Sequence, residues 1–311
     1  MDIFTLALGD HVHGFAALCN SLCAAGFDAR IHVGYRGEIG CEIAAGAPIV
    51  PHELPEDALQ PMNRKAAFLL DQAESTFLYI DADIVVMNRA VLDALSDAVT
   101  TGPVFCAEGI IPEHDIRRAV WRRTRRSSLE ESPDTGRADA GRADARPTNM
   151  YFNSGLVCGD IRRDRRLISD WNRMIRQTLP ANGDGMFEVP YFPMPDQDCL
   201  NALLQDEKSA FSCIGPPDVW YATSAASPFS HVGSFEAALL HGTGPKPWRH
   251  KSVPARDPNL YEAAWYRFSS QDTPWVRSRL ELTRPVSDWL RNSRRGRVIS
   301  KAKRLRARFA F

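Results

Sequence analysis

With 311 residues, 44% of them hydrophobic and 24% charged, the chain can bury a sizeable core without disulfides, as one large α/β domain or two small ones. No run of 18 apolar residues occurs, and Met1–Phe4 carries no basic segment, so the sequence predicts neither a membrane-spanning helix nor a signal peptide. The net charge is zero, but residues 291–311 hold nine Lys or Arg and no acid. The rest of the chain therefore carries 29 bases against 38 acids, a charge of −9.

The first hundred residues alternate between strand and helix patterns. Gly26 is a natural helix stop after apolar residues at helical spacing. We expect strands at 3–8, 29–35, 77–81, 84–86 and 104–107, and helices at 15–26 and 66–70. This order predicts an α/β fold with a Rossmann-like, mostly parallel central sheet flanked by helices. Ligands bind such sheets beyond the carboxyl ends of the strands.

The segment 113–148 breaks this pattern. Six arginines lie between Arg117 and Arg126, and Gly-Arg-Ala-Asp-Ala occurs twice, at 136–140 and 141–145. Low hydrophobicity and mixed charge predict a flexible surface loop, which is either a tolerated insertion or a lid that faces the acceptor. After it, we expect a strand at 151–157, a helix at 162–177, a helix that begins near 196–199, a strand at 237–241 and a helix beyond 258.

Seven cysteines are scattered through the chain without any Cys-x-x-Cys pair. An odd number of thiols, most of them in apolar runs, favours free buried cysteines over a disulfide framework or a structural zinc site. This cysteine usage predicts a protein of the reducing cytoplasm.

Asp81-Ala82-Asp83 follows the apolar strand 77–80, and two carboxylates separated by one residue project to the same side of a strand. Such a pair repels itself unless a cation lies between the two carboxylates. Oxygen ligands favour Mg²⁺ or Mn²⁺, which could bind a diphosphate and neutralise charge on a leaving group. The alternative is an ordinary pair of surface acids.

His241 opens the segment His-Gly-Thr-Gly-Pro-Lys-Pro-Trp at 241–248. Its glycines allow the backbone to approach a phosphate closely, and Lys246 offers a point charge suited to a diphosphate. An imidazole beside two carboxylates shifts the metal preference toward Mn²⁺. An ordinary Gly/Pro turn is the alternative.

Four blocks in this order resemble glycosyltransferase family 8, the retaining group that includes bacterial lipooligosaccharide galactosyltransferases and glycogenin. The blocks are Tyr-Ile-Asp-Ala-Asp at 79–83, Phe-Asn-Ser-Gly-Leu-Val at 152–157, Asp-Gln-Asp-Cys-Leu-Asn at 196–201, and the segment 241–248. The resemblance implies a GT-A catalytic domain over 1–255 with the charged insertion at 113–148. Residues 256–311 would then form a C-terminal helical region with a basic tail from about 291.

The resemblance also implies roles for individual residues. It places a metal, Mn²⁺ or alternatively Mg²⁺, on Asp81, Asp83 and His241. It assigns binding of a UDP-sugar donor to Asp10, Arg64, Asp81, Ala82, Asn153, Ser154, Gly244 and Lys246. It assigns the reacting sugar to Asp196 and Gln197.

Simpler interpretations compete with these roles. Asp10 and Asp196 are also good helix N-caps, Arg64 could be a solvated helix residue, and Asn-Ser-Gly at 153–155 could be a turn. The chain also departs from the family, which has an aromatic residue near its base-binding site, whereas residues 11–13 are His-Val-His. Either one of these histidines stacks on uracil or the base selectivity differs.

The implied reaction is metal-dependent transfer of a hexose, glucose or galactose, from UDP to a glycan acceptor. The expected acceptor is lipid-linked or part of a lipopolysaccharide or capsule. A glutamine has no anionic form near neutral pH, so Gln197 favours front-face attack by the acceptor hydroxyl over a covalent intermediate. A nucleotidyltransferase would need a basic Gly-rich loop after the first strand, but residues 9–14 hold no lysine or arginine. A haloacid dehalogenase-type phosphatase would need Gly-Thr after the acids, where this chain has Ile84-Val85. A non-catalytic sugar-nucleotide-binding protein remains the alternative.

The basic tail, residues 291–311, alternates Lys and Arg with Val, Ile, Leu and Phe. This pattern suits a short helix on an anionic membrane surface, and it predicts a peripheral protein on the inner face of the cytoplasmic membrane. Binding to nucleic acid and a solubilising tail are the alternatives. No nucleic-acid-binding motif accompanies the tail, so we expect no nucleic-acid partner.

Overall fold

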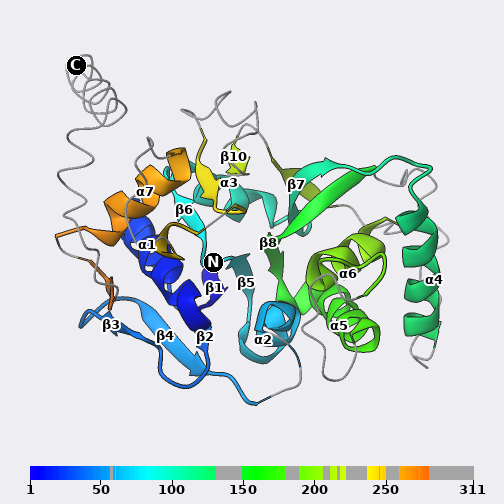
Figure 1. Ribbon diagram of the computed structural model, residues 1–311, viewed down its shortest axis with the longest axis horizontal. Coiled ribbons are helices and arrows are strands. Elements are labelled where there is room, and N and C mark those ends of the chain that lie inside the picture. Colours follow the sequence, from blue (N-terminus) through cyan, green and yellow to red (C-terminus); the bar gives the residue numbers. More distant parts are fainter. Residues whose placement is uncertain are drawn as a thin grey trace.

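The computed structural model of the 311-residue chain describes residues 1–56, 59, 61–130, 149–179, 189–205, 211–215, 218–221, 237–244, 246–249, 259–272 and 274–279. A seven-stranded sheet forms its centre (Figure 1). In spatial order the strands are β4 (Ile49–Glu53), β2 (Ile31–Tyr35), β1 (Asp2–Leu6), β5 (Thr76–Ile80), β8 (Met150–Asp160), β7 (Val104–Ile110) and β9 (Ser212–Ile214). Only β8 runs antiparallel to its neighbours in this sheet, which confirms the predicted mostly parallel α/β architecture.

Helices cover both faces of this sheet, and the side chains of the strands alternate between two cores. In β5, Leu78 and Ile80 join a core with α1 (Val12–Ala24) and α3 (Ala90–Ala98). Phe77 and Tyr79 join a second core on the other face. That core includes α2 (Lys65–Gln72), α5 (Ile161–Thr178) and α6 (Pro195–Leu204). Burial of both faces accounts for the continuous apolar runs of the central strands.

Helix α1 ends where the sequence predicts. Gly26 adopts a φ of +72°. Its N–H bonds to Cys23 O, and the N–H of Phe27 bonds to Leu22 O. This pair of hydrogen bonds satisfies the last carbonyls of the helix, and the left-handed conformation favours glycine at residue 26.

Two smaller sheets bring distant parts of the chain together. One contains β10 (Val219–Tyr221), β11 (Leu239–His241) and β6 (Ile84–Val86), and the other pairs β12 (Val276–Ser278) with β3 (Cys41–Ile43). Helix α7 (Leu260–Ser269) packs against α1 and begins with a capping box made by Asn259 and Glu262. Because β11 is antiparallel to β6, His241 lies opposite Ile84, the residue after Asp83.

Residues 116–130 contradict the loop that the sequence predicts over 113–148. They form a helix, α4 (Ile116–Glu130), that packs against α5 and α6. Arginine is a good helix former, and the buried Arg118, Trp121 and Ser128 recur at helical spacing, so composition alone misjudged this segment. The rest of the insertion, 131–148, and the basic tail lie outside the described residues. The proposed division at 255/256 stays a prediction, and the described helices include none long and apolar enough to cross a membrane.

Candidate functional site

The acidic pair lies in the turn that joins β5 to β6. The N–H of Asp81 donates to Gly155 O in β8 at 2.8 Å, and the N–H of Ile84 donates back to Asp81 O at 3.0 Å. These bonds fix the turn at the carboxyl end of a central strand, where parallel sheets bind ligands. Asp83 is buried, whereas the side chain of Asp81 is 24% exposed and can reach a ligand.

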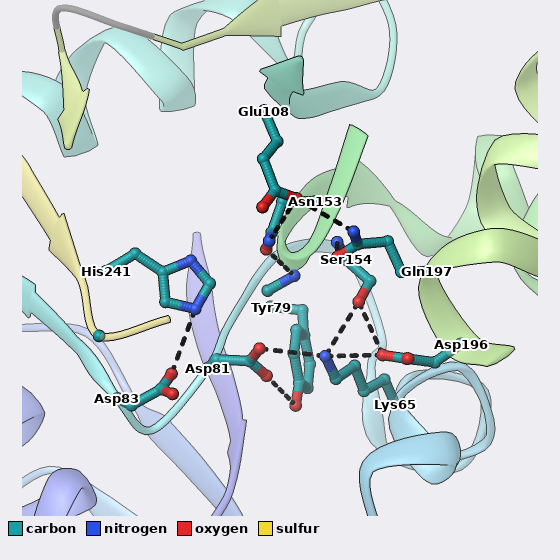
Figure 2. A network of polar contacts seen from close by, with 12 residues as sticks. Lys65, Tyr79, Asp81, Asp83, Glu108, Asn153, Ser154, Asp196, Gln197 and His241 are labelled. Carbon is teal, nitrogen blue, oxygen red and sulfur yellow. Dashed lines mark hydrogen bonds and ion pairs between the residues drawn. The ribbon is translucent and has the colours of Figure 1, made fainter. Parts of the chain in front are cut away.

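His241 joins the two acids as the sequence predicts. Ligand atoms of Asp81, Asp83 and His241 all lie within 4.8 Å of one another, and His241 Nε2 is 3.3 Å from Asp83 Oδ1 (Figure 2). Lys246 Nζ donates to Asp83 Oδ2 and to Gly242 O. Burial disfavours the ionised form of Asp83, but Lys246 and His241 outweigh burial and hold the pKa of this carboxyl well below its ordinary value.

The residues present fit a divalent cation. Asp83 Oδ1 is buried and accepts no hydrogen bond from the described residues, although His241 Nε2 faces it. A Cβ atom on Gly155 would lie 2.6 Å from Asp81 Oδ2 and 2.7 Å from His241 Cε1, so only glycine leaves this space open. Two carboxylates and one imidazole form a donor set suited to Mn²⁺ or Mg²⁺.

Lys65 is the centre of a second set of polar contacts. Its Nζ lies 3.0 Å from Asp81 Oδ2, 2.9 Å from Asp196 Oδ2 and 3.1 Å from Ser154 Oγ (Figure 2). Burial alone would lower the pKa of this ammonium, but Asp196 and Asp81 outweigh burial and raise it. Lys65 is therefore a fixed positive charge between the acidic pair and α6.

Asp196 and Gln197 lie in the first turn of α6. Asp196 Oδ2 accepts a hydrogen bond from Ser154 Oγ at 2.7 Å, and its backbone carbonyl accepts one from Trp171 Nε1 at 2.6 Å. The alternative that Asp196 caps the helix is wrong, because Met194 is the N-cap and Pro195 the first helical residue. The side chain of Asp196 is thereby left to the site.

The amides of Asn153 and Gln197 meet at Glu108. Glu108 Oε2 accepts from Asn153 Nδ2 at 3.1 Å and from Gln197 Nε2 at 3.0 Å (Figure 2). The amide oxygens accept backbone hydrogens instead, Asn153 Oδ1 from Gly155 N and Gln197 Oε1 from Ser154 N. These contacts assign the orientation of both amides and reject the alternative that 153–155 is only a turn, since the segment lies inside β8.

Asp10 lies in a short 3-10 helix (Gly9–His11) that follows β1. It caps no helix, because Leu8 and His11 hold the N-cap positions of this helix and α1. Both carboxylate oxygens accept from Arg249, and this hydrogen-bonded pair lowers the pKa of Asp10. Beside it, the rings of His11 and Trp248 meet edge to face at 5.9 Å.

Three other predicted donor residues have definite places. Arg64 ends a 3-10 helix (Pro61–Arg64), is buried rather than solvated, and donates to Pro55 O. Ala82 is buried, and its carbonyl oxygen faces Gly14 so closely that a Cβ there would approach within 2.6 Å. Gly244 is half-exposed and lies between β11 and Lys246. Donor binding by these residues stays a prediction.

Sequence reasoning missed four residues that the structure brings to the site: Lys65, Glu108, Gly155 and Arg249. Gly155 stood in a quoted block, and Lys65 stood beside Arg64, so both could have been found. Glu108 has no signal in the sequence, because it is the extra residue of a bulge in β7 opposite Phe152 and Tyr151.

No family model matches the chain, and no curated protein sequence matches it. Among solved structures, the chain is similar to the apo bifunctional glycosyltransferase WbbM, with 12% identity, a TM-score of 0.53, and coverage of 88% of this chain and 50% of that one. It is also similar to the galactosyltransferase LgtC in complex with donor and acceptor sugar analogues, with 18% identity, a TM-score of 0.48, and coverage of 81% and 90%. The likeness to WbbM shows that the chain shares the fold of that protein.

Proposed function

We propose that this protein is a metal-dependent, retaining glycosyltransferase that moves a hexose from a UDP-sugar to a glycan acceptor. The observation that carries the proposal is the convergence of Asp81, Asp83 and His241 within 4.8 Å at the end of β5, with Lys246 bound to Asp83. On a glycosyltransferase fold, this arrangement matches the chemistry that a diphosphate leaving group requires.

The two acids and His241 would hold Mn²⁺, or Mg²⁺, which when bound neutralises charge on the departing diphosphate. Lys246 adds a positive charge at the same place, and the half-exposed Gly244 lets the backbone come close to a phosphate. Asp10 with its Arg249 partner would contact the ribose and base.

Asp196 and Gln197 would flank the transferred sugar. The amide of Gln197 is engaged at both ends, by Glu108 and by the backbone of Ser154, and Asp196 is paired with Lys65. Because both side chains already have partners, neither is free to act as a nucleophile. This supports front-face attack by the acceptor hydroxyl, whose proton the leaving phosphate would accept. A sugar ester trapped on Asp196 would contradict this mechanism.

The acceptor and the location are inferred from the sequence. We propose a lipid-linked, lipopolysaccharide or capsule saccharide as acceptor, and contact with the inner face of the cytoplasmic membrane through the basic tail 291–311. The alternative is a non-catalytic protein that binds nucleotide sugars on the same fold.

The test is donor hydrolysis and thermal stability of the full chain with UDP-glucose or UDP-galactose, each with and without Mn²⁺. The correct donor should raise the unfolding midpoint only with metal present, because binding stabilises the folded state. Asp83→Asn should lower Mn²⁺-dependent hydrolysis at least about 100-fold, since a metal ligand contributes several kcal/mol to the transition state. Asp93→Asn, at an exposed acid of α3, is the matched control.

A midpoint shift without hydrolysis would favour the non-catalytic alternative. Equal hydrolysis by Asp83→Asn and by the unaltered chain would contradict the proposed metal site.

A further inference from the structure

Four of the five large hydrophobic side chains exposed in the described part of the chain gather on one edge of the molecule. They are Ile110, 79% exposed, Ile116, 62%, Tyr191, 42%, and Met150, 38%. We call these four residues the apolar rim. Exposed hydrophobic residues scattered singly are ordinary, but a cluster of them indicates an interaction site.

Contacts between neighbouring elements hold the rim together. Ile110 at the end of β7 is the register partner of Met150 at the start of β8. Arg118 Nη2 in α4 donates to Asn149 Oδ1, one residue before Met150, at 2.9 Å. Figure 1 shows the end of β7 and the start of β8 near the start of α4.

Tyr191 is fixed in an unusual conformation. Its φ is +68°, the left-handed region that residues other than glycine rarely adopt. Trp121 Nε1 in α4 donates to Tyr191 O at 2.8 Å, and the neighbouring Phe192 is buried. The backbone is thus strained in a way that leaves this aromatic ring exposed, and tyrosine is the type of residue enriched at membrane–water interfaces.

Helix α4 adds a row of positive charge next to the rim. It carries six arginines against a single acid, Glu130. Arg122, Arg123 and Arg126 are exposed and recur with Ile116 at helical spacing, so all four lie on one face. The chain as a whole has no net charge, so this face is a local concentration of positive charge.

The rim also leads directly into the site. Ile110 follows Glu108 by two residues, and Met150 precedes Asn153 by three, on the two strands whose amide and carboxylate groups meet Gln197.

We propose that the apolar rim and the arginine face of α4 dock the protein on an anionic membrane surface. A bilayer interface offers negative headgroups for the arginines and a less polar layer for Ile110, Ile116 and Tyr191 at the same time. A soluble anionic glycan would use the arginines but not the isoleucines, so the combination favours a membrane. That the docked edge admits a lipid-borne acceptor rests on the proposed function, whereas the docking itself does not.

The test measures partition of the full chain onto vesicles of phosphatidylglycerol and phosphatidylcholine. Arg122→Gln/Arg123→Gln/Arg126→Gln should weaken binding at least about tenfold, because each arginine near an anionic surface contributes about fivefold. Arg30→Gln/Arg36→Gln/Arg277→Gln removes the same charge from exposed arginines of β2, β12 and their flanks and should change binding less than about threefold.

A second measurement reports which edge touches the bilayer. A polarity-sensitive fluorophore is attached through Ile116→Cys, after Cys23→Ser and Cys213→Ser remove the two cysteines that are not buried. Its emission should shift to the blue when anionic vesicles are added, whereas the same label at Arg36→Cys should not respond. Ile116, Arg36 and Cys213 are exposed, and Cys23→Ser is a small change at a half-buried residue, so these substitutions should not unfold the chain.

Equal loss of vesicle binding in both arginine triples, or no response of the label at residue 116, would overturn the proposal. Loss of binding to a soluble anionic polysaccharide with vesicle binding unchanged would assign the face to a glycan instead and would also overturn it. Donor hydrolysis, measured on the same variants in detergent-free buffer, should be unchanged. If the unaltered chain showed no donor hydrolysis, the result would contradict the proposed function but not the docking surface.

Discussion

At Gly155 the backbone of β8 passes between the candidate metal ligands. A Cβ atom there would lie 2.6 Å from Asp81 Oδ2, 2.7 Å from Asn153 Oδ1 and 2.7 Å from His241 Cε1. We expect Gly155→Ala to push the carboxylate and the imidazole apart and to weaken Mn²⁺ binding about 10- to 100-fold, as displacement of supporting groups does at metal sites. Overpacking should cost about 1–3 kcal/mol of stability.

Gly109→Ala, in β7, is the matched control because nothing lies within 4 Å of a Cβ built there. Calorimetric titration with Mn²⁺ and urea unfolding would separate metal affinity from stability. Retention of full Mn²⁺ affinity by Gly155→Ala would show that the cation does not bind beside this glycine.

Single residues could be predicted from sequence where spacing decides their position. Asp81 and Asp83 follow an apolar strand, and strand geometry alone places both at its carboxyl end. Arg64 and Lys65 could not be separated in this way, because adjacent helical residues point in directions about 100° apart. The residue that faces the site is decided by where the 3-10 helix ends and α2 begins. The contacts with Asp81 and Asp196 show that Lys65 faces the site, whereas donor binding by Arg64 stays a prediction.

Strands β2 and β4 carry a pair of histidines, of which His32 is buried and His52 half-buried. His32 Nδ1 and His52 Nε2 are 2.9 Å apart, and the ring of His32 stacks on Phe4. Burial lowers the pKa of both imidazoles, and for His32 the charge of His52 and of Arg30 lowers it further while Asp2 opposes. The unfolded chain therefore binds these protons more readily, so the free energy of unfolding should decrease as pH falls below about 6.5.

Asp198, in α6, changes the free energy of unfolding with pH in the opposite direction. Burial raises the pKa of this carboxyl to about 6, so the folded chain takes up its proton before the unfolded chain does, and stability increases as pH falls from about 6. Urea unfolding between pH 7.5 and 5.5 should show a smaller loss of stability for His52→Gln than for the unaltered chain. If His52→Gln and the unaltered chain lost the same amount of stability, the histidine pair would not be the cause of that loss.

Whole elements were predictable when one face was apolar and a stop signal was present. Helix α1 satisfies both conditions, and α5 shows its apolar residues at 3.6-residue spacing. Helix α4 was missed because its apolar residues are few and its charge is high, although Trp121 anchors it. The bulges of β7 were not predictable, since the extra residue at Glu108 depends on the register of β7 against β8, which is distant in the sequence.

For the whole molecule, the alternation of strands and helices predicted the class of fold, because right-handed β-α-β connections leave few other arrangements. It could not predict the reversal of β8 or the pairing of β11 with β6, which depend on contacts between residues far apart in the sequence. Strand patterns alone did not predict that His241 lies beside Asp81 and Asp83. That prediction came from the family resemblance.

The candidate metal ligands come from two distant parts of the chain. Ligand binding should therefore reduce local unfolding of both parts, which hydrogen exchange can measure. Asp81 and Asp83 lie in the turn that follows β5 of the central sheet, whereas His241 and Lys246 belong to the segment that leads to α7. Mn²⁺ with UDP should therefore slow hydrogen exchange at 81–86 and 239–249, because binding stabilises the closed form of both segments together. Strands β2 and β4, which share no residue with the site, serve as the internal reference. Asp83→Asn should abolish the effect, and equal slowing in β2 and β4 would mean that ligand binding stabilises the fold without linking these segments.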